Sequence, residues 1–117
     1  MNMNDPNALL MVYCTCPDHA AAVSMAEGIV DAGLAACVNI VPGLTSIYQW
    51  QGERKQGTEE LLLIKTTNAA YPALQQHIVD SHPYELPEII AVSIETGLPA
   101  YLDWVRESCA LTPRLDA

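Results

Sequence analysis

The sequence predicts an α+β domain of the ferredoxin-like class, with the element order βαββαβ and one extra helix at the C-terminal end. Short apolar runs bounded by turn residues indicate strands, and segments with apolar residues at helical spacing lie between them. Two strand segments in the middle of the chain are separated only by a polar turn, which indicates an extended hairpin. In this class, right-handed crossovers place both inner helices on one face of a four-stranded antiparallel sheet.

The first half of the chain contains a strand, a helix and a second strand. Residues 8–16 form a short apolar run that predicts a strand, and Asp18 is a suitable N-cap for the helix that follows. This helix is expected to end at Gly33, because glycine accepts the positive φ of a helix C-terminus. A second strand is expected over residues 36–52, with a bulge at Pro42-Gly43, because proline has no N–H to donate to the ladder.

The second half repeats this alternation. Residues 52–57 are a polar turn bounded by glycines, and residues 58–67 return as the third strand of the hairpin. Apolar residues at helical spacing predict a second helix over residues 71–81, ending before the His-Pro pair that follows. Residues 88–94 read as a fourth strand, and residues 98–109 carry the apolar stripe of a C-terminal helix.

These elements fit a single domain over residues 8–111, with a disordered N-terminus at residues 1–7 and a polar tail at residues 112–117. A chain of 117 residues is within the size range of one domain. The apolar run at residues 8–13 is too short for a membrane span or a signal sequence, so no membrane partner is expected. We expect a cytoplasmic protein whose four cysteines are reduced, since their spacing is not that of a secreted disulfide framework.

Charge and hydropathy indicate which partners to expect. Five Lys and Arg residues against fourteen Asp and Glu residues give a net charge of −9, which repels phosphate backbones and excludes nucleic acid as a partner. Cations are the better ionic partners. Three strand segments are continuous apolar runs, the pattern of strands that are buried on both faces. Because no second layer remains in the chain to cover the far face, we expect a ring-like oligomer of identical subunits.

Several unusual segments of the chain resemble the CutA family in order and spacing. They are Cys14-Thr15-Cys16-Pro17-Asp18, Leu34 to Ile40, Ser46-Ile47-Tyr48-Gln49-Trp50, Lys65-Thr66, His82-Pro83-Tyr84-x-x-Pro87-Glu88 and Tyr101-Leu102-x-Trp104. The resemblance covers nearly the whole chain. It implies a ferredoxin-like fold, a homotrimer, a cytoplasmic location, a link to divalent-cation tolerance and no catalytic activity. It also implies that no cofactor is required.

The resemblance further implies a copper site at Cys14 and His82. Ser81 stands where some members of the family have a second histidine. A thiolate with an imidazole suits Cu(I), Cu(II) or Zn(II), and tight sites usually have three or four protein donors. Cys16 lies two residues beyond Cys14, on the same face of a regular strand, and can supply a third donor.

Each of these residues also has a purely structural interpretation. Cys14 and Cys16 are well suited to a protein core, and this is the more common role of free cysteine. His82 can cap the second helix by bonding a free carbonyl. Cys37 and Cys109 are expected to serve packing alone.

A second group of residues predicts a cleft between subunits. Aromatic clusters usually seal subunit contacts, and they can also roof a small binding cleft. A lone lysine in a core strand needs a partner, and we expect a salt bridge to a glutamate. Paired glutamates at the proline turn, Glu85 and Glu88, are either solvated or able to bind cations. The candidate cleft residues are Lys65, Tyr84, Glu88, Trp50, Tyr101 and Trp104.

The sequence therefore predicts one of two functions. The first is a divalent-cation tolerance or metal-ion response protein that binds copper or a similar divalent ion weakly. The alternative is a trimeric regulatory module that binds a small effector or a protein partner at clefts between subunits. An enzyme is disfavoured, because the sequence has no nucleophile elbow, no cysteine-protease signature and no phosphate-binding glycine loop.

Overall fold

The computed structural model describes residues 5–111, and its elements follow the predicted order. They are β1 (Leu9–Cys16), α1 (His19–Asp31), β2 (Cys37–Trp50), β3 (Glu53–Thr67), α2 (Tyr71–Ser81), β4 (Ile90–Ser93) and α3 (Pro99–Ser108). The strands form one antiparallel sheet in the order β2-β3-β1-β4. This is the ferredoxin-like arrangement with a C-terminal helix added, so the predicted fold class is confirmed.

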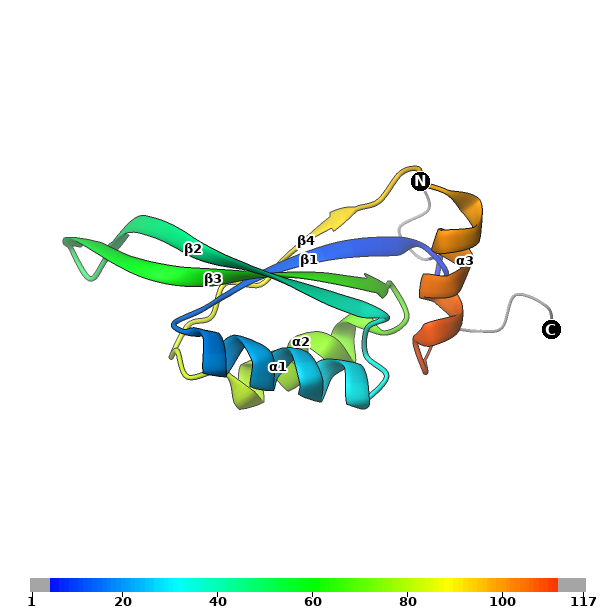
Figure 1. The fold of residues 1–117 in the computed structure, drawn as a ribbon, viewed down its shortest axis with the longest axis horizontal. Coiled ribbons are helices and arrows are strands. Elements are labelled where there is room, and N and C mark those ends of the chain that lie inside the picture. The colour runs from blue at the N-terminus through cyan, green and yellow to red at the C-terminus, as the bar shows by residue number, and fades with distance from the viewer. Residues whose placement is uncertain (1–4, 112–117) are drawn as a thin grey trace.

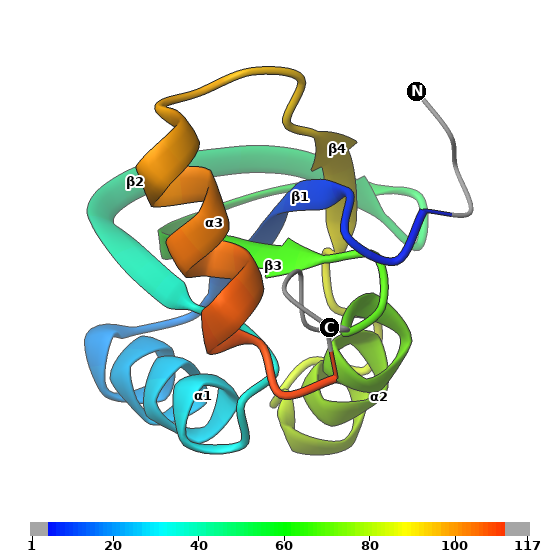
Figure 2. The ribbon, with the colours of Figure 1, turned by 90° about the vertical axis from the view of Figure 1, so that its right-hand side faces the viewer.

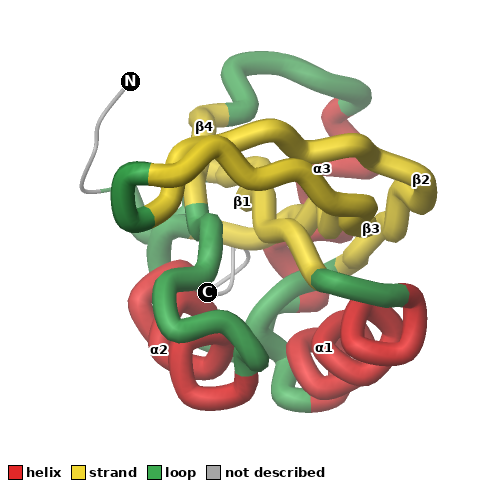
Figure 3. The backbone as a smooth tube through the Cα atoms, turned by 90° about the vertical axis from the view of Figure 1, so that its left-hand side faces the viewer, coloured by secondary structure: helices red, strands yellow, loops and turns green. Residues whose placement is uncertain are grey.

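The helices and the long hairpin give the molecule two distinct ends. Helices α1 and α2 lie side by side against one face of the sheet (Figures 1 and 3). The β2-β3 hairpin extends beyond them at one end, and α3 lies at the other end (Figures 1 and 2). The molecule is 51 Å along its longest axis and about half as wide. Within residues 5–111, the face of the sheet opposite α1 and α2 has no such layer.

Helix α1 begins and ends where its sequence predicts. The side chain of Asp18 accepts a hydrogen bond from the Ala21 N–H at 2.8 Å, which satisfies one of the free donors of the first turn. Gly33 takes φ 69° just after the helix, and the Leu34 N–H then donates to the Ile29 carbonyl. This is the Schellman arrangement, in which glycine avoids the steric cost of a left-handed residue.

The core lies between the sheet and the two inner helices. Because side chains alternate along a strand, Val12 of β1 and Ile64 of β3, which are paired in register, point to the same face. Both are fully buried against Ile29 of α1 and against Leu74 and Ile78 of α2. Burying a side chain of this size contributes about 1.5–3 kcal/mol, so this layer is the main source of stability within one chain.

The open face of the sheet is apolar but incompletely covered. Leu63 and Tyr13 form a cross-strand pair on this face and are half-buried. Ile90 and Val92 of β4 continue the same face and are 54% and 44% exposed. The continuous apolar runs in the sequence therefore correspond to one buried face and one open apolar face.

The hairpin turn differs from the prediction of a six-residue turn over residues 52–57. Gln51 and Gly52 form a two-residue turn with φ values of 52° and 80°, and Trp50 pairs directly with Glu53. Positive φ at both central residues is the type I′ geometry, whose twist matches that of the flanking strands. The third strand therefore starts at Glu53 and not at residue 58. The bulge at Pro42-Gly43 is confirmed by a register shift between Val41 and Leu44.

The fourth strand is shorter than the predicted range of 88–94. Pairing with β1 covers Ile90 to Ser93. Ile89 packs against the core on the helix side, and the residues just before it do not pair with β1. Beyond this strand, the Ile94 N–H donates one further bond to the Leu9 carbonyl at 3.0 Å. The β4 edge strand of the sheet is therefore four residues long.

The ends of the domain are held by hydrogen bonds to α3 and to the loops. Residues 5–7, which we expected to be disordered, have defined contacts: the Ala8 N–H donates to the Asp5 carbonyl, and Arg106 Nε donates to the Asn7 carbonyl. Residues 1–4 and the predicted tail at 112–117 lie outside the described residues. None of the helices within residues 5–111 is long and apolar enough to cross a membrane.

Candidate metal centre

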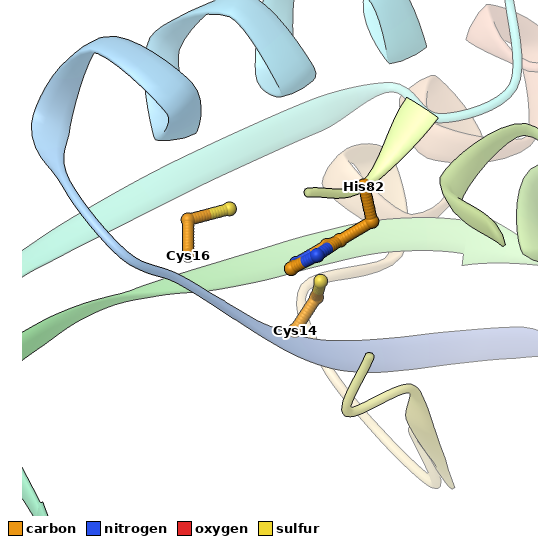
Figure 4. Close-up of side chains that lie close together, drawn as sticks. All are labelled: Cys14, Cys16 and His82. Carbon is orange, nitrogen blue, oxygen red and sulfur yellow. The ribbon is translucent and has the colours of Figure 1, made fainter. Parts of the chain in front are cut away.

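Three metal-ligating side chains converge on the helix side of β1. Cys14 and Cys16 rise from the strand, and the ring of His82 reaches them from the end of α2 (Figure 4). Their ligand atoms all lie within 4.8 Å of one another, and all three residues are buried. Within residues 5–111, this is the one group of three or more such residues that is close enough to hold an ion. The resemblance to the CutA family implied the pairing of Cys14 with His82, and the two-residue repeat of a strand predicted Cys16 as the third donor.

Local structure explains why these residues meet. The two-residue repeat of β1 points Cys14 and Cys16 to the same face, where α1 and α2 cover them. Helix α2 ends at Ser81 because His82 has extended backbone angles, with φ −76° and ψ 139°. Proline at position 83 then prevents the helix from continuing. The histidine thus stands at the helix end with its ring over β1.

The ring of His82 already has two hydrogen bonds. One ring nitrogen, Nε2, lies 2.8 Å from the Thr15 carbonyl, and the other, Nδ1, accepts the Tyr84 N–H at 3.0 Å. Because a carbonyl can only accept, Nε2 carries the proton and the imidazole is in its neutral form. His82 does bond a free carbonyl, as the capping interpretation predicted, but that carbonyl belongs to β1 and not to the helix. An ion at Nε2 would have to displace this bond.

The two thiols differ in their readiness to ionise. The pKa of Cys14 is raised well above the usual value for a thiol, first by its hydrogen bond with Cys16 and then by burial. The pKa of Cys16 is lowered, because it accepts the hydrogen bond from Cys14. Cys16 therefore loses its proton first. Since thiolates and not thiols bind metal ions, Cys16 is the donor that is most readily available.

A cavity of about 770 Å³ lies on the other side of β1, between the β2-β3 hairpin and the loop at residues 83–88. Thr15, the residue between the two cysteines, lines it. The remaining lining residues are Ser46, Ile47, Tyr48, Trp50, Lys55, Glu59, Pro83, Tyr84, Glu85, Leu86, Pro87 and Glu88. One strand thus separates a buried group of soft donors from an open, polar and aromatic cavity.

Tyr84 connects the cavity to the metal-ligating group. Its hydroxyl donates to Glu59 Oε2 at 2.7 Å, and its ring lies against the ring of His82, with centroids 4.7 Å apart. The pKa of Tyr84 is raised, first by burial and then by this bond to a carboxylate, both of which favour the neutral phenol. Tyr84 therefore fixes His82 from the cavity side through its backbone and its ring.

The six residues predicted to form a cleft are divided by the structure into two groups. Trp50, Tyr84 and Glu88 line the cavity. The other three gather beside α3: Tyr101 and Trp104 have ring centroids 5.4 Å apart, and Lys65 Nζ lies 5.6 Å from the centre of the Tyr101 ring. Within one chain, the second group does not line the cavity.

Lys65 does not form the salt bridge to a glutamate that the sequence predicted. Within residues 5–111, no carboxylate lies within ion-pair distance of its ammonium group. Nζ donates instead to Asn39 Oδ1 at 2.7 Å and lies 4.0 Å from Cys37 Sγ. The register explains this, since the residues opposite Lys65 on its two neighbouring strands are Cys37 and Met11.

Sequence reasoning missed Glu59 as a cavity residue. It lies in the first half of β3, in a continuous run of polar residues and glycine that resembles an ordinary solvated strand. The available signal was a pair of adjacent carboxylates, Glu59 and Glu60, which point to opposite faces. Glu60 pairs with His19 at 2.8 Å on the helix side, while Glu59 meets Tyr84 on the cavity side.

Fold and site together define a small ferredoxin-like protein with a buried Cys/Cys/His group. The sequence profile of the family described as "CutA1 divalent ion tolerance protein" matches residues 10–108. The chain belongs to this family. The family is named for tolerance of divalent ions and not for a reaction, as expected of a non-enzymatic protein.

Individual relatives agree with this assignment. The chain is 51% identical to "Divalent-cation tolerance protein CutA" of Thermus thermophilus over 98 residues, which cover 84% of this chain and 95% of the relative. It is 41% identical to "Protein CutA" of Homo sapiens over 102 residues, which cover 87% of this chain and 57% of the relative.

Solved structures show the same fold. A divalent cation tolerance protein from Thermus thermophilus superposes with a TM-score of 0.84 at 48% identity, covering 90% of this chain and 99% of that one. CutA1 from Oryza sativa gives a TM-score of 0.84 at 42% identity, covering 86% of this chain and 93% of that one.

Proposed function

We propose that the chain contributes to divalent-cation tolerance by binding copper weakly at Cys14, Cys16 and His82. The observation that carries this proposal is the convergence of two thiols and an imidazole, all buried and within 4.8 Å of one another. Weak binding is expected because the imidazole must give up a hydrogen bond and one thiol holds its proton firmly. Family membership supports a role with metal ions.

The donor set fits a soft ion better than a hard one. Two sulfurs and one nitrogen suit Cu(I) or another thiophilic ion, whereas Mg²⁺ and Ca²⁺ require oxygen donors. Burial also favours Cu(I), because Cys16 loses its proton before Cys14, and the singly charged pair formed in this way would be neutralised by a singly charged ion. Bound there, the ion would be shielded from water and from other ligands. Cys16 and Cys14 would hold it, and His82 would complete the set.

Copper titration of the purified, reduced protein tests this proposal. The affinity for Cu(I) is measured without oxygen by competition with a chromogenic chelator. Cys14→Ser and Cys16→Ser should each lower the affinity by about a hundredfold, since losing one of three donors removes a coordinate bond. Cys37→Ser is the matched control, because this half-buried thiol lies outside the group. Equal affinities for the Cys14→Ser, Cys37→Ser and unmodified proteins would rule out the site.

We also propose that the chain assembles as a homotrimer through its open sheet face. Ile90 and Val92 are large apolar side chains left exposed on β4, beside half-buried Leu63 and Tyr13. An apolar sheet face of this kind calls for cover by another subunit. The long β2-β3 hairpin extends far enough beyond the helices to contact a neighbour (Figure 1). Sedimentation at micromolar concentration should therefore give three times the mass of one chain.

The reduced state of the cysteines supports a cytoplasmic location as part of this proposal. Cys14, Cys16 and Cys37 form no disulfide within residues 5–111, and thiols of this kind persist in reducing compartments. Cell fractionation followed by detection of the protein tests the location. Recovery in a secreted or periplasmic fraction would contradict it.

A second candidate function is a regulatory module that binds a small effector or a protein partner. It is favoured by the cavity of about 770 Å³, a volume typical of ligand sites. Within one chain, Lys65, Tyr101 and Trp104 do not line this cavity. In a trimer, they would line it only if they came from a second subunit. A thermal-shift screen of small ligands tests this function, because saturating binding stabilises the folded state by a few kcal/mol.

A further inference from the structure

The hydrogen bonds of the His82 ring suit the ion-free protein and not an ion-bound one. Nε2 donates to the Thr15 carbonyl at 2.8 Å, and Nδ1 accepts the Tyr84 N–H at 3.0 Å. In most histidines that bind a metal ion, the nitrogen away from the ion carries the proton and donates it to a carboxylate, a carbonyl or water. Here the group that faces Nδ1 is itself a donor. The surroundings of the ring must therefore change when an ion binds.

Any ion bound to a neutral His82 ring removes the acceptor of the Tyr84 N–H. A neutral imidazole has one proton, so the nitrogen away from the ion must carry it. With the ion at Nε2, the proton lies on Nδ1, which then faces the Tyr84 N–H as a second donor. With the ion at Nδ1, the ion itself takes the lone pair. Turning the ring over moves a carbon to the position of Nδ1. Each arrangement breaks the same hydrogen bond.

This hydrogen bond is one of two that hold the loop at residues 83–88. Within residues 5–111, both are made by Tyr84: its N–H donates to His82, and its hydroxyl donates to Glu59 Oε2 at 2.7 Å. Two of the six loop residues are prolines, which have no N–H to donate. Segments with few hydrogen bonds open at a low cost in free energy. The loss of one of the two bonds should therefore loosen the loop.

The same loop forms part of the wall of the cavity on the other side of β1. All six of its residues line that cavity, together with Thr15, whose carbonyl holds the ring of His82. The rings of His82 and Tyr84 also pack together, with centroids 4.7 Å apart. A change in the His82 ring is therefore transmitted to the cavity wall through a direct contact.

We propose that Cu(I) binding at the buried cysteine and histidine group releases the loop at residues 83–88, so that the ion-bound protein presents a different surface at the cavity. Tyr84 is the positioning residue of this switch, because its N–H holds the His82 ring toward Thr15 when no ion is bound. This inference rests on the proposed copper function and describes its regulation. Since coupling between two sites is reciprocal, whatever holds the loop in place lowers the affinity for Cu(I).

Nuclear magnetic resonance of the full, reduced protein, with and without one Cu(I) per chain, is the direct test. Cu(I) is diamagnetic, so amide and ring nitrogens stay visible. On loading, the ring nitrogen shifts of His82 should show the ion on one nitrogen and the proton on the other. The Tyr84 amide should exchange with solvent about fivefold faster or more, because it has lost its acceptor. The rings of His19 and His77, and the Ala21 amide at the start of α1, are internal controls.

Loosening the loop at its other hydrogen bond distinguishes a switch from a fixed support. Tyr84→Phe keeps the ring and the N–H but loses the bond to Glu59. For a loop that must open, this variant should bind Cu(I) about fivefold more tightly, because opening then costs less free energy. A loop that only supports His82 would give weaker binding in the same variant. Tyr71→Phe, which loses an exposed bond to Gln75 on α2, is the matched control and should leave the affinity unchanged.

The outcomes separate this inference from the copper proposal on which it rests. If the affinity for Cu(I) falls in Cys14→Ser and Cys16→Ser but the Tyr84 amide stays protected on loading, the switch is overturned and the copper site is retained. Unchanged or weaker binding by Tyr84→Phe overturns the switch in the same way. If the cysteine variants bind Cu(I) as well as the unmodified protein, no ion reaches His82 and both proposals fail.

Discussion

The helix-side face and the open face of the sheet have similarly apolar side chains but very different burial. On the helix side, Leu62 and Ile64 of β3 are fully buried, whereas Leu61 and Leu63 of the same strand are half-buried on the open face. Of these four consecutive residues, two lie in the fully buried core and two lie on the partly covered face. Within residues 5–111, a single chain therefore covers one face of the sheet and leaves the other face open.

The two faces of the sheet also differ at three consecutive residues of β1. Cys14 and Cys16 point into the core beside His82, and Thr15 between them lines the open cavity. The His82 ring bonds the Thr15 carbonyl, so the two sides meet at one backbone group. The buried side offers soft donors without water, and the open side offers carboxylates and rings. The two sides of one strand are therefore chemically different.

The largest expected effect concerns the completed core. Ile64→Ala should lower the free energy of unfolding by about 2–5 kcal/mol, because it leaves a cavity under α1 and α2. The loss should be the same at all protein concentrations. Leu63→Ala, one residue earlier, is the matched control, and its loss should shrink as the protein is diluted below the concentration at which the subunits dissociate, because a lost subunit contact matters only in the assembled state. Urea unfolding at several concentrations measures both. A concentration-independent loss of equal size for both variants would remove the distinction between the faces.

A charge on the open face should prevent assembly without unfolding the chain. Val92→Asp is expected to weaken subunit association by about a hundredfold or more, because a carboxylate would be buried without a partner. Val79→Asp on α2 is the control, since Val79 is similarly exposed but lies outside the sheet. Analytical ultracentrifugation gives the subunit number, and circular dichroism checks the fold. Intact trimers of Val92→Asp would show that the open face is not the interface.

His82 should be important for stability even without metal. His82→Ala is expected to cost about 1–3 kcal/mol, because the Thr15 carbonyl and the Tyr84 N–H lose their buried partner. Cys14→Ala removes one buried sulfur and should cost less, about 1 kcal/mol. Chemical denaturation of the metal-free protein measures both. If His82→Ala were as stable as the unmodified protein, the histidine would not link β1 to the loop at residues 83–88.

The smallest expected effect is a dependence on alkaline pH. Because the pKa of Tyr84 is higher in the folded state than its ordinary value near 10, the unfolded chain loses this proton first. The neutral phenol of Tyr84 makes its full contribution to the free energy of unfolding below about pH 10, and this contribution is lost as the pH rises further. Tyr84→Phe should show a shallower decline in melting temperature between about pH 9 and 11.5. Tyr71→Phe, whose hydroxyl bonds to Gln75, is the control and should decline like the unmodified protein.

Much of the fold could be predicted because local signals and the overall arrangement agree. Asp18 and Gly33 mark the ends of α1, and Pro42-Gly43 marks the bulge, each through a conformational preference of a single residue type. The hairpin turn could not be predicted in this way. Gln51 has no special preference for positive φ, and its conformation is imposed by the pairing of Trp50 with Glu53.

The candidate site was predictable in part. The spacing of Cys14 and Cys16 in a strand places them on one face, and the inclusion of His82 was implied by the resemblance to the CutA family. The hydrogen bonds of the histidine ring depend on the distance between α2 and β1, which no local pattern encodes. Likewise, the bond between Glu59 and Tyr84 joins residues 25 positions apart, and sequence spacing did not indicate it.

X-ray absorption spectroscopy of the protein loaded with one Cu(I) per chain identifies the atoms that bind the ion. A Cys/Cys/His centre should give copper two sulfur neighbours and one nitrogen neighbour, from Cys14, Cys16 and His82. In Cys16→Ser, one sulfur neighbour should be lost, and in Cys37→Ser the spectrum should be unchanged. A spectrum with only nitrogen and oxygen neighbours, or one that is unchanged in Cys16→Ser, would contradict a metal centre on the helix side of β1.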